Sequence, residues 1–296
     1  GLVGSEMCIR DRYYAPAEVY GISLHGHGTG WFPPELNNLR QPMSGESYIE
    51  HDLRRPDNAL TRAYGPDGEE YMSAGDLVEG LSEIKFDYVI FDVCFMSSIE
   101  LLYDLKDNAR YILASPAEIM GKGIPYHKVL PLLFSRDYPI DRRLASAASA
   151  IVEYYRGESY PSAAFTVVAT AGLQGVADAV KRIFAAGVEE PDFGEIQYLE
   201  VLEPEHAFFD LKDYLKNITG NGAAKSAYAE FETALANAIV AESHTPQIYS
   251  ALGTGLSGGF FPADDVCGIS SYIPREWLPV TREAWYATAW ARYVMP

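Results

Sequence analysis

The segment that most constrains the fold is residues 86–96, an apolar run with the sequence Phe-Asp-Tyr-Val-Ile-Phe-Asp-Val-Cys-Phe-Met. A run of this length, rich in β-branched and aromatic residues, is typical of a strand buried on both faces inside a parallel sheet. Ser97 follows it, and Glu100 comes three residues later, a spacing that predicts a capping box at the start of a helix. Cys94 is therefore expected where a central strand gives way to a helix, at the sheet edge where ligands collect.

Other short apolar runs alternate with helical patterns along the chain. We expect further strands over residues 20–24, 111–114 and 165–169, and helices over residues 73–84, 124–134, 141–155 and 173–186. This alternation predicts an α/β fold with a mainly parallel sheet and helices on both faces. The second half is expected to be mostly helical, with helices over residues 210–218, 223–241 and 283–293 and strands over residues 247–252 and 268–273.

The composition excludes several classes of partner and site. The chain has 296 residues, with 41 acidic against 23 basic side chains and a net charge of −18, which argues against nucleic acid or an anionic membrane as partner. The same charge is compatible with a basic substrate, although acidic proteins in general are merely soluble. No segment approaches the roughly 18 consecutive apolar residues of a membrane span. Three cysteines without a C-x-x-C pair exclude a disulfide framework and a cysteine-rich zinc site, so Cys94 is expected to be a free thiol.

The first twelve residues fit nothing that follows them. Residues 1–12 resemble translated adaptor sequence, so we leave them, and Cys8 with them, out of the fold. We expect from this that the authentic start, with any signal peptide, is missing.

Two glycine-rich patterns and a histidine pair suggest sites that the rest of the sequence does not support. Residues 25–28 are similar to the oxyanion turn of lipases, and residues 255–259 match G-x-S-x-G. A nucleophile elbow needs an acid and then a histidine after its serine, whereas the last histidine, His244, precedes Ser257. His25 and His27 point the same way in an extended segment, but zinc needs three or four ligands and no third one follows at a recognisable spacing.

His27 and Cys94 form the most informative pair. Each follows a predicted parallel strand, and neighbouring strands lie only about 4.8 Å apart, so both side chains can face one cleft. A thiolate with an imidazole that protonates the leaving amine is sufficient for amide cleavage. The backbone N–H groups near Gly28 and Cys94 can hold a developing oxyanion, which is worth about 3 kcal/mol per donor. Because a buried cysteine after a strand is usually a core residue, spacing alone leaves both interpretations open.

Several motifs resemble the clostripain family of cysteine peptidases, in the clan that also holds caspases, gingipains and legumains. They are residues 27–31 (His-Gly-Thr-Gly-Trp), 91–96 (Phe-Asp-Val-Cys-Phe-Met) and 99–100, with looser similarity over residues 114–118, 123–126, 209–211 and 268–274. The resemblance implies His27 and Cys94 as a catalytic dyad and cleavage after Arg or Lys. It also implies a caspase-like three-layer sandwich over residues 13–190, with residues 191–296 as a mostly helical portion packed on this core.

The resemblance has further implications and some departures. It implies self-cleavage at a basic residue between the two motifs, where Arg40, Arg54, Arg55 and Arg62 lie. It implies a monomeric bacterial protein outside the cytoplasm (secreted, periplasmic or lipid-anchored), with no required cofactor, although calcium is compatible with the acidic composition. The departures are Gly26, where many members have Asp or Ser, Val93, where Ala is commoner, and the absence of the opening strands of the family.

Asp92 lies two residues before Cys94, on the same face of the strand and about 6.5 to 7 Å away. A carboxylate there opposes thiolate formation by like-charge repulsion, and this cost makes sense if Asp92 binds a substrate guanidinium or ammonium. The alternative is that Asp92 accepts backbone N–H groups in the turn, and we favour the pocket. The sequence thus predicts a cysteine endopeptidase that acts on proteins or peptides with basic residues. The alternative is a non-catalytic module that binds peptides or glycans.

Overall fold

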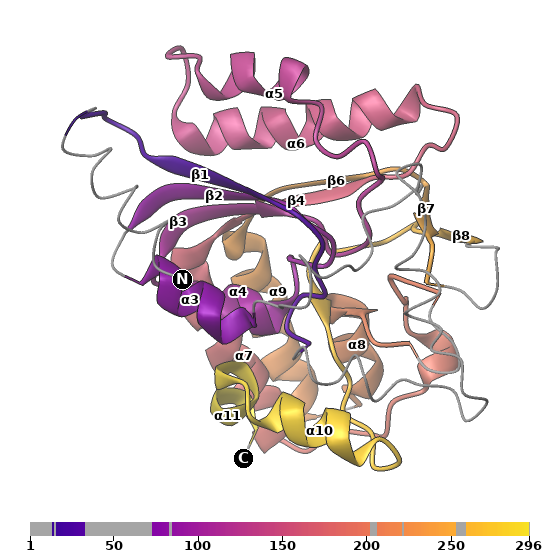
Figure 1. The fold of residues 1–296 in the computed structure, drawn as a ribbon. Coiled ribbons are helices and arrows are strands. Elements are labelled where there is room, and N and C mark those ends of the chain that lie inside the picture. Colours follow the sequence, from indigo (N-terminus) through magenta and orange to yellow (C-terminus); the bar gives the residue numbers. More distant parts are fainter. Residues whose placement is uncertain are drawn as a thin grey trace.

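The core of the structure, a computed structural model, is a five-stranded sheet with the strand order β1-β2-β3-β4-β6 (Figure 1). The structure describes residues 14, 16–32, 73–82, 85–201, 206–220, 222–252 and 259–295. The strands are β1 (Gly21–His25), β2 (Phe86–Asp92), β3 (Ala109–Ala114), β4 (Ala164–Ala169) and β6 (Ile239–His244). The first three are parallel, β4 is antiparallel to β3, and β6 is antiparallel to β4, so four of the five strands point the same way. This confirms the predicted mainly parallel sheet.

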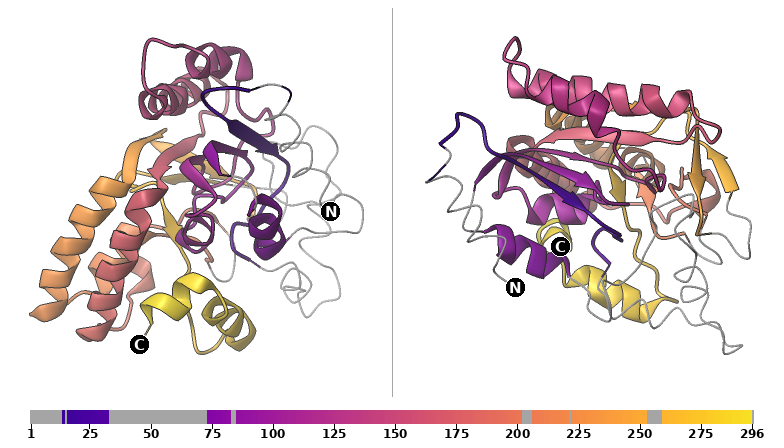
Figure 2. Two further views of the ribbon diagram at one scale, coloured as in Figure 1. Left: turned by 90° about the vertical axis from the view of Figure 1, so that its left-hand side faces the viewer. Right: turned by 45° about the horizontal axis from the view of Figure 1, so that its top comes forward.

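Helices cover both faces of this sheet, which makes three layers (Figures 1 and 2). On one face lie α5 (Tyr126–Leu133) and α6 (Ile140–Arg156). On the other lie α3 (Ala74–Leu81), α4 (Ile99–Asp104), α7 (Leu173–Ala185) and α9 (Ala223–Ala238). The predicted three-layer α/β sandwich is therefore confirmed.

The rest of the chain adds small elements around the end of the sheet. They are the 3-10 turns η2 (Thr170–Gly172) and η3 (Phe193–Glu195), the paired strands β5 (Phe209–Asp210) with β9 (Ser270–Ser271) and β7 (Gln247–Ser250) with β8 (Gly259–Pro262), and the helices α8 (Leu211–Ile218), α10 (Pro279–Tyr286) and α11 (Ala289–Val294). Helix α11 packs against α4 and α7. The domain boundary at residue 190 stays a prediction. Within the described residues, no helix combines the length and apolar character that crossing a membrane requires.

Two helix predictions in the second half were wrong. The helix expected over residues 223–241 ends at Ala238, because Ile239 and Val240 start strand β6 and pair with β4. The single helix expected over residues 283–293 is two helices. Thr288 interrupts it, since its side chain accepts the N–H of Ala291 and starts α11 as an N-cap. In both places a tertiary contact or a cap outweighs the helical periodicity.

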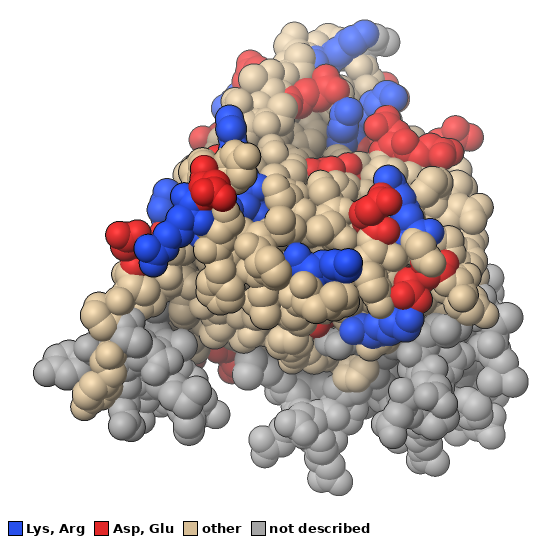
Figure 3. Space-filling model, turned by 90° about the horizontal axis from the view of Figure 1, so that it is seen from above, with Lys and Arg blue, Asp and Glu red and all other residues tan. Residues whose placement is uncertain are grey.

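The face over α5 and α6 carries acidic and basic side chains interspersed rather than one uniform patch (Figure 3). Ion pairs join Lys122 to Glu158 and Arg156 to Glu153 at the end of α6. Although the chain has a net charge of −18, this face offers no single-sign field to a charged partner.

Strand β2 is the buried centre that the sequence predicted. Val89, Ile90 and Phe91 are buried between the two helical layers, with β1 and β3 on either side. The predicted capping box after this strand is wrong, however. Helix α4 begins at Ile99, and the Ser97 hydroxyl donates to the carbonyl of Gly268 instead of capping the helix. The reason is tertiary, because the chain around β9 lies alongside this turn and takes up its polar groups.

Glu100 joins α4 to the C-terminal part of the chain. Its Oε1 accepts the backbone N–H of Tyr272 at 2.9 Å, the indole N–H of Trp285 at 2.9 Å and the hydroxyl of Ser271 at 3.3 Å. Burial raises the pKa of Glu100 to about 7, although these donors act in the opposite direction. An ionised Glu100 therefore costs stability that a protonated one does not.

We expect Glu100→Gln to change how stability depends on pH. The native carboxyl holds its proton up to about pH 7, whereas the unfolded one loses it near pH 4.5, so its stabilising protonation is lost as the pH rises through this window. The variant should match the wild type near pH 5 and exceed it by about 2 kcal/mol at pH 8, as measured by urea denaturation. Glu153→Gln on the exposed side of α6 is the control, and equal curves for both variants would contradict the prediction.

Candidate active site

The register between β1 and β2 brings the predicted dyad to one edge. His25 is the partner of Asp92 in the parallel pairing. His27 lies two residues beyond His25, and Cys94 lies two residues beyond Asp92, so both follow the carboxyl ends of adjacent strands at the same level. His27 is exposed, whereas Cys94 is 0% exposed.

Gly28 and Gly30 pack the histidine turn onto the cysteine loop. A Cβ atom on Gly28 would lie 2.3 Å from Cγ1 of Val93 and 3.1 Å from the carbonyl oxygen of Cys94. Gly30 has a φ of +59°, and a Cβ there would lie 2.6 Å from the carbonyl oxygen of Phe95. Only glycine allows so close an approach, so the backbone that follows His27 lies directly against the residues that flank Cys94.

The turn at Cys94 contains a strained residue. Phe95 has a φ of +61° and is the one non-glycine residue with a positive φ in the described part of the chain. It is held there by packing and by a hydrogen bond. Its ring stacks on Phe208 at 4.3 Å, and its N–H donates to the carbonyl of Ala117 at 3.0 Å. Such strain persists only where the surroundings enforce it, and it turns the chain sharply at the end of β2.

The Cys94 sulfur faces the segment that follows β3. The backbone N–H of Ile119 donates to Sγ at 3.1 Å. The same segment continues along the loop, where the N–H of Ser97 donates to the carbonyl of Ser115 at 2.9 Å. A backbone N–H directed at sulfur favours the thiolate over the thiol. The thiol is also buried.

Asp92 is held from two sides. Its carboxylate is 1% exposed. Oδ1 accepts the N–H of Ile124 at 3.1 Å, and Oδ2 lies 3.1 Å from Nδ1 of His25, whose side chain is 50% exposed. The alternative role, acceptance of a backbone N–H, is thus present, but the N–H comes from the segment before α5 rather than from the turn. Substrate binding by Asp92 stays a prediction.

Comparison with known proteins decides the family. The model of the clostripain family matches residues 51–275, which include Asp92 and Cys94 but not His27. The chain belongs to the clostripain family. It is a cysteine peptidase, and this favours the enzyme over the non-catalytic binding module. No curated protein matches the chain.

Solved structures similar to this clostripain-family chain include proteins from Bacteroides and Parabacteroides. A Bacteroides fragilis cysteine protease is 28% identical, with 78% of this chain and 96% of that chain covered and a TM-score of 0.68. A Bacteroides thetaiotaomicron clostripain in complex with a peptide inhibitor is 25% identical, with 78% and 98% covered and a TM-score of 0.67. An inactive zymogen C11 protease from Parabacteroides distasonis is 24% identical, with 99% and 75% covered and a TM-score of 0.77, which supports the fold.

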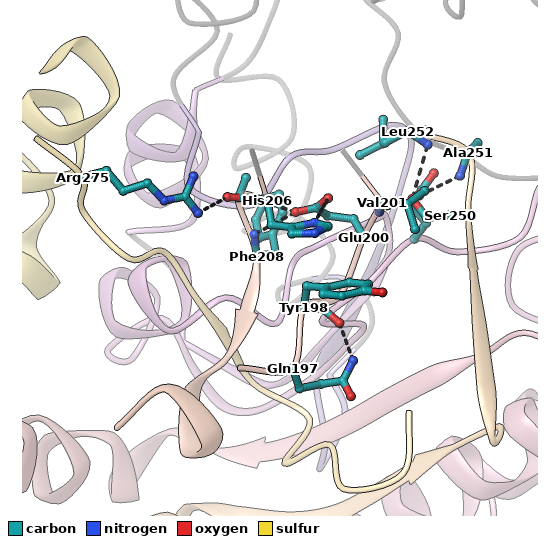
Figure 4. Close-up of polar contacts among 12 residues, drawn as sticks. Gln197, Tyr198, Glu200, Val201, His206, Phe208, Ser250, Ala251, Leu252 and Arg275 are labelled. Atoms are coloured by element: carbon teal, nitrogen blue, oxygen red, sulfur yellow. Dashed lines mark hydrogen bonds and ion pairs between the residues drawn. The ribbon is translucent and has the colours of Figure 1, made fainter. Parts of the chain in front are cut away.

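A second polar cluster of this clostripain-family protein is centred on Glu200 (Figure 4). Glu200 is fully buried, and its Oε1 accepts the N–H groups of Ala207 and Phe208. Its Oε2 lies 3.3 Å from Nδ1 of His206, and the His206 ring stacks on Tyr198 at 4.1 Å. Phe208 is the residue that stacks on Phe95, so Glu200 fixes the partner of the strained turn. No spacing in the sequence singled out this cluster.

Three further groups close this region. The Arg275 guanidinium donates to the carbonyl of His206 and lies 4.7 Å from the centre of the Phe193 ring. Glu118, which precedes Ile119, accepts the N–H of Ala251 at 2.9 Å through Oε2. Asp210 caps α8, because its carboxylate accepts the N–H of Asp213, and burial raises its pKa to about 6. The carboxylates of Glu118 and Asp210 thus bind backbone N–H groups of the surrounding segments.

Some of the predicted residues lie outside the described part of the chain, and some predicted ligands are not tested. Arg40, Arg54, Arg55 and Arg62, with Ser257, lie outside the described residues. Within the described part of the chain, no three His, Cys, Asp or Glu side chains are grouped to hold a metal ion. A requirement for calcium stays untested, as does independence from cofactors.

We expect Gly28→Ala to damage both activity and stability. The added methyl would lie 2.3 Å from Val93, so the histidine turn must move away from the cysteine loop. We predict a loss of about 1 to 3 kcal/mol in stability and a fall of at least tenfold in kcat/KM. Denaturation curves and a peptide reporter measure the two effects.

Gly80→Ala is the matched control. A Cβ at Gly80, in helix α3, meets nothing within 4 Å, and alanine is a better helix former than glycine. This variant should keep its activity and gain slightly in stability. Full activity in both variants would show that the close packing at Gly28 does not matter for catalysis.

Proposed function

We propose that this protein is an endopeptidase that cleaves after Arg or Lys, with Cys94 as nucleophile and His27 as general acid and base. One observation carries the proposal: the β1–β2 register and the contact of Gly28 with Val93 bring the His27 turn against the Cys94 loop. Both lie at the carboxyl ends of parallel strands, where open α/β sheets hold their substrates.

The dyad accounts for every bond in the reaction. The Cys94 thiolate attacks the scissile carbonyl carbon, and the backbone N–H groups of Gly28 and Cys94 donate to the oxyanion. The tetrahedral intermediate collapses as the C–N bond breaks, and protonated His27 gives its proton to the leaving amine. Neutral His27 then takes a proton from water, which attacks the thioester and releases the acid product and the Cys94 thiolate.

Asp92 is the group that would recognise the basic side chain before the cut. It is a buried carboxylate two residues from the nucleophile, and a guanidinium or ammonium forms strong, charge-assisted hydrogen bonds with such a group. A relative supports this preference, because the inhibitor bound by the Bacteroides thetaiotaomicron clostripain is named BTN-VLTK-AOMK, and its peptide letters end in lysine. The net charge of −18 adds a general attraction for basic peptides.

The closed site implies an opening step before catalysis. Cys94 and Asp92 are both buried, so a peptide can reach neither in this form. Self-cleavage at Arg40, Arg54, Arg55 or Arg62 would supply such a step, and the Parabacteroides distasonis relative is described as an inactive zymogen. We further propose a monomeric protein outside the cytoplasm. A relative from Bacteroides thetaiotaomicron is described as secreted.

Cys94→Ala should abolish cleavage of Arg and Lys reporter peptides, because the variant has no thiolate. Cys267→Ala is the matched control and should keep activity within threefold, since Cys267 is the other free cysteine of the described residues and has no role in the proposed chemistry. Reporter fluorescence and labelling by a basic-peptide electrophile measure the effect. Substantial turnover by the Cys94 variant would refute the assignment.

Asp92→Asn should remove the preference for basic residues while leaving the dyad in place. The amide keeps an oxygen that can accept the Ile124 N–H, but it has no charge for a guanidinium. We expect kcat/KM to fall about 10- to 100-fold for an Arg peptide and to change little for a citrulline peptide, given the strength of hydrogen bonds to charged groups. An unchanged ratio between the two peptides would exclude Asp92 from the pocket.

A further inference from the structure

We propose that His25 is a specificity-determining residue, which competes with the basic side chain of the substrate for the Asp92 carboxylate. This proposal rests on the proposed function, since it needs Asp92 as the recognition group. In its protonated form, His25 supplies the positive charge that the substrate would otherwise bring. In its neutral form, it leaves the Asp92 charge to the substrate.

The geometry places the two groups in direct competition. Nδ1 of His25 lies 3.1 Å from Oδ2 of Asp92, and the two residues are partners in the β1–β2 register. The Asp92 side chain is 1% exposed and the His25 side chain is 50% exposed, so the contact joins a buried carboxylate to a side chain that reaches solvent. Oδ1 already accepts the N–H of Ile124. A guanidinium that binds Asp92 must therefore share Oδ2 with His25 or displace it.

Two neighbours hold the imidazole in this position. The Tyr126 ring, at the start of α5, lies 5.1 Å from the His25 ring at an interplanar angle of 35°. The Tyr126 hydroxyl in turn is 2.8 Å from the hydroxyl of Ser23, two residues before His25 on β1. The imidazole is thus packed against an aromatic ring that is itself anchored to the same strand. The contact between His25 and Asp92 is therefore supported by the packing of Tyr126 and by the Tyr126–Ser23 hydrogen bond.

The charge of His25 decides how strongly it competes. Histidine is the side chain that changes charge between pH 5 and pH 8, so the proposal predicts a substrate preference that depends on pH. An imidazolium at 3.1 Å neutralises the carboxylate and repels an incoming guanidinium. A neutral imidazole does neither, and the substrate then gains the full charge-assisted hydrogen bond.

Several charged groups near the His25–Asp92 pair have partners of their own. On β2, Asp87 lies at the opposite end of the strand and pairs with Arg110. Before α5, Lys122 pairs with Glu158. Arg143 on α6 donates to the carbonyls of Leu133 and Ser135. The other titratable groups on these elements are His27 and Cys94 beyond the strand ends, Tyr88 on β2, Tyr126, His127 and Lys128 on α5, and Asp141, Arg142, Glu153, Tyr154, Tyr155 and Arg156 on α6.

The test compares two reporter peptides that differ only in Arg or citrulline before the cut. Citrulline has nearly the shape of arginine without its charge, and both peptides pass through the same chemical steps. The ratio of their kcat/KM values therefore cancels the ionisation of Cys94 and His27. In the wild-type chain we expect this ratio to rise about tenfold from pH 5.5 to pH 8, and the change should appear in KM rather than in kcat.

Two substitutions separate charge from structure. His25→Gln keeps a side chain that can donate a hydrogen bond but carries no charge. Its Arg-to-citrulline ratio of kcat/KM should stay at the high wild-type value across the pH range. His25→Lys holds a permanent positive charge beside Asp92, and its ratio should stay low at both pH values. His127→Gln removes a histidine whose ring lies against Tyr154, and it should keep the wild-type slope.

A ratio that is flat with pH in the wild type, or an unchanged slope in His25→Gln, overturns the proposal. The wild-type profile decides between these outcomes even if a His25 variant fails to fold. If the purified chain shows no turnover, binding of peptides that end in Arg or citrulline to the Cys94→Ala chain, measured by calorimetry at both pH values, gives the same comparison.

Asp92→Asn separates failure of this proposal from failure of the proposed function. If Asp92→Asn keeps the full Arg-to-citrulline ratio, the pocket assignment fails and the role of His25 fails with it. If Asp92→Asn removes the ratio while the His25 variants behave as wild type, the pocket stands and only the role of His25 is overturned.

Discussion

The parallel pairing of β1 with β2, in one register, is the constraint on which the proposed catalytic edge depends. Side chains alternate along a strand, so a slip of one residue would turn His25 and His27 to the opposite face from Asp92 and Cys94. Strand β2 holds its position because it is buried between two helical layers and cannot shift without exposing its apolar side chains. The register of β1 is set against this fixed strand. The apolar run that dominates the sequence therefore also sets the chemistry at its end.

The turn at the end of β2 shows how the rest of the molecule serves this edge. Phe95 adopts a strained backbone conformation, which is stable only because Phe208 stacks on its ring and Ala117 accepts its N–H. Phe208 is in turn fixed by Glu200, and α4 beyond the turn is tied to the C-terminal segment by Glu100. Buried carboxylates that bind backbone N–H groups thus hold segments far apart in the sequence around one cysteine. Each is costly to bury, and in each the Oε1 atom accepts several donors.

The sequence was informative where local pattern decides the structure and silent where tertiary contacts do. The buried strand, the three layers and the positions of His27 and Cys94 at strand ends all followed from apolar periodicity and two motifs. The role of Glu100 did not, because its partners lie more than 170 residues away and no spacing rule connects them. In the sequence, His25 is only one half of an incomplete metal site. Its true partner, Asp92, becomes visible only when the register between two strands is known.

Strands β1 and β2 contribute different kinds of side chain to the predicted site. The proposed nucleophile Cys94 and the proposed recognition group Asp92 lie at the end of the inner strand β2 and are buried, while His25 and His27 lie at the end of the outer strand β1, which alternates between exposed and partly buried residues. Among the described strands β1 lies at the edge of the sheet, and an edge strand has fewer buried contacts than a central one, so it can move at lower cost. Moving β1 would change the access and the charge balance of both pairs together, while the core around β2 stays intact.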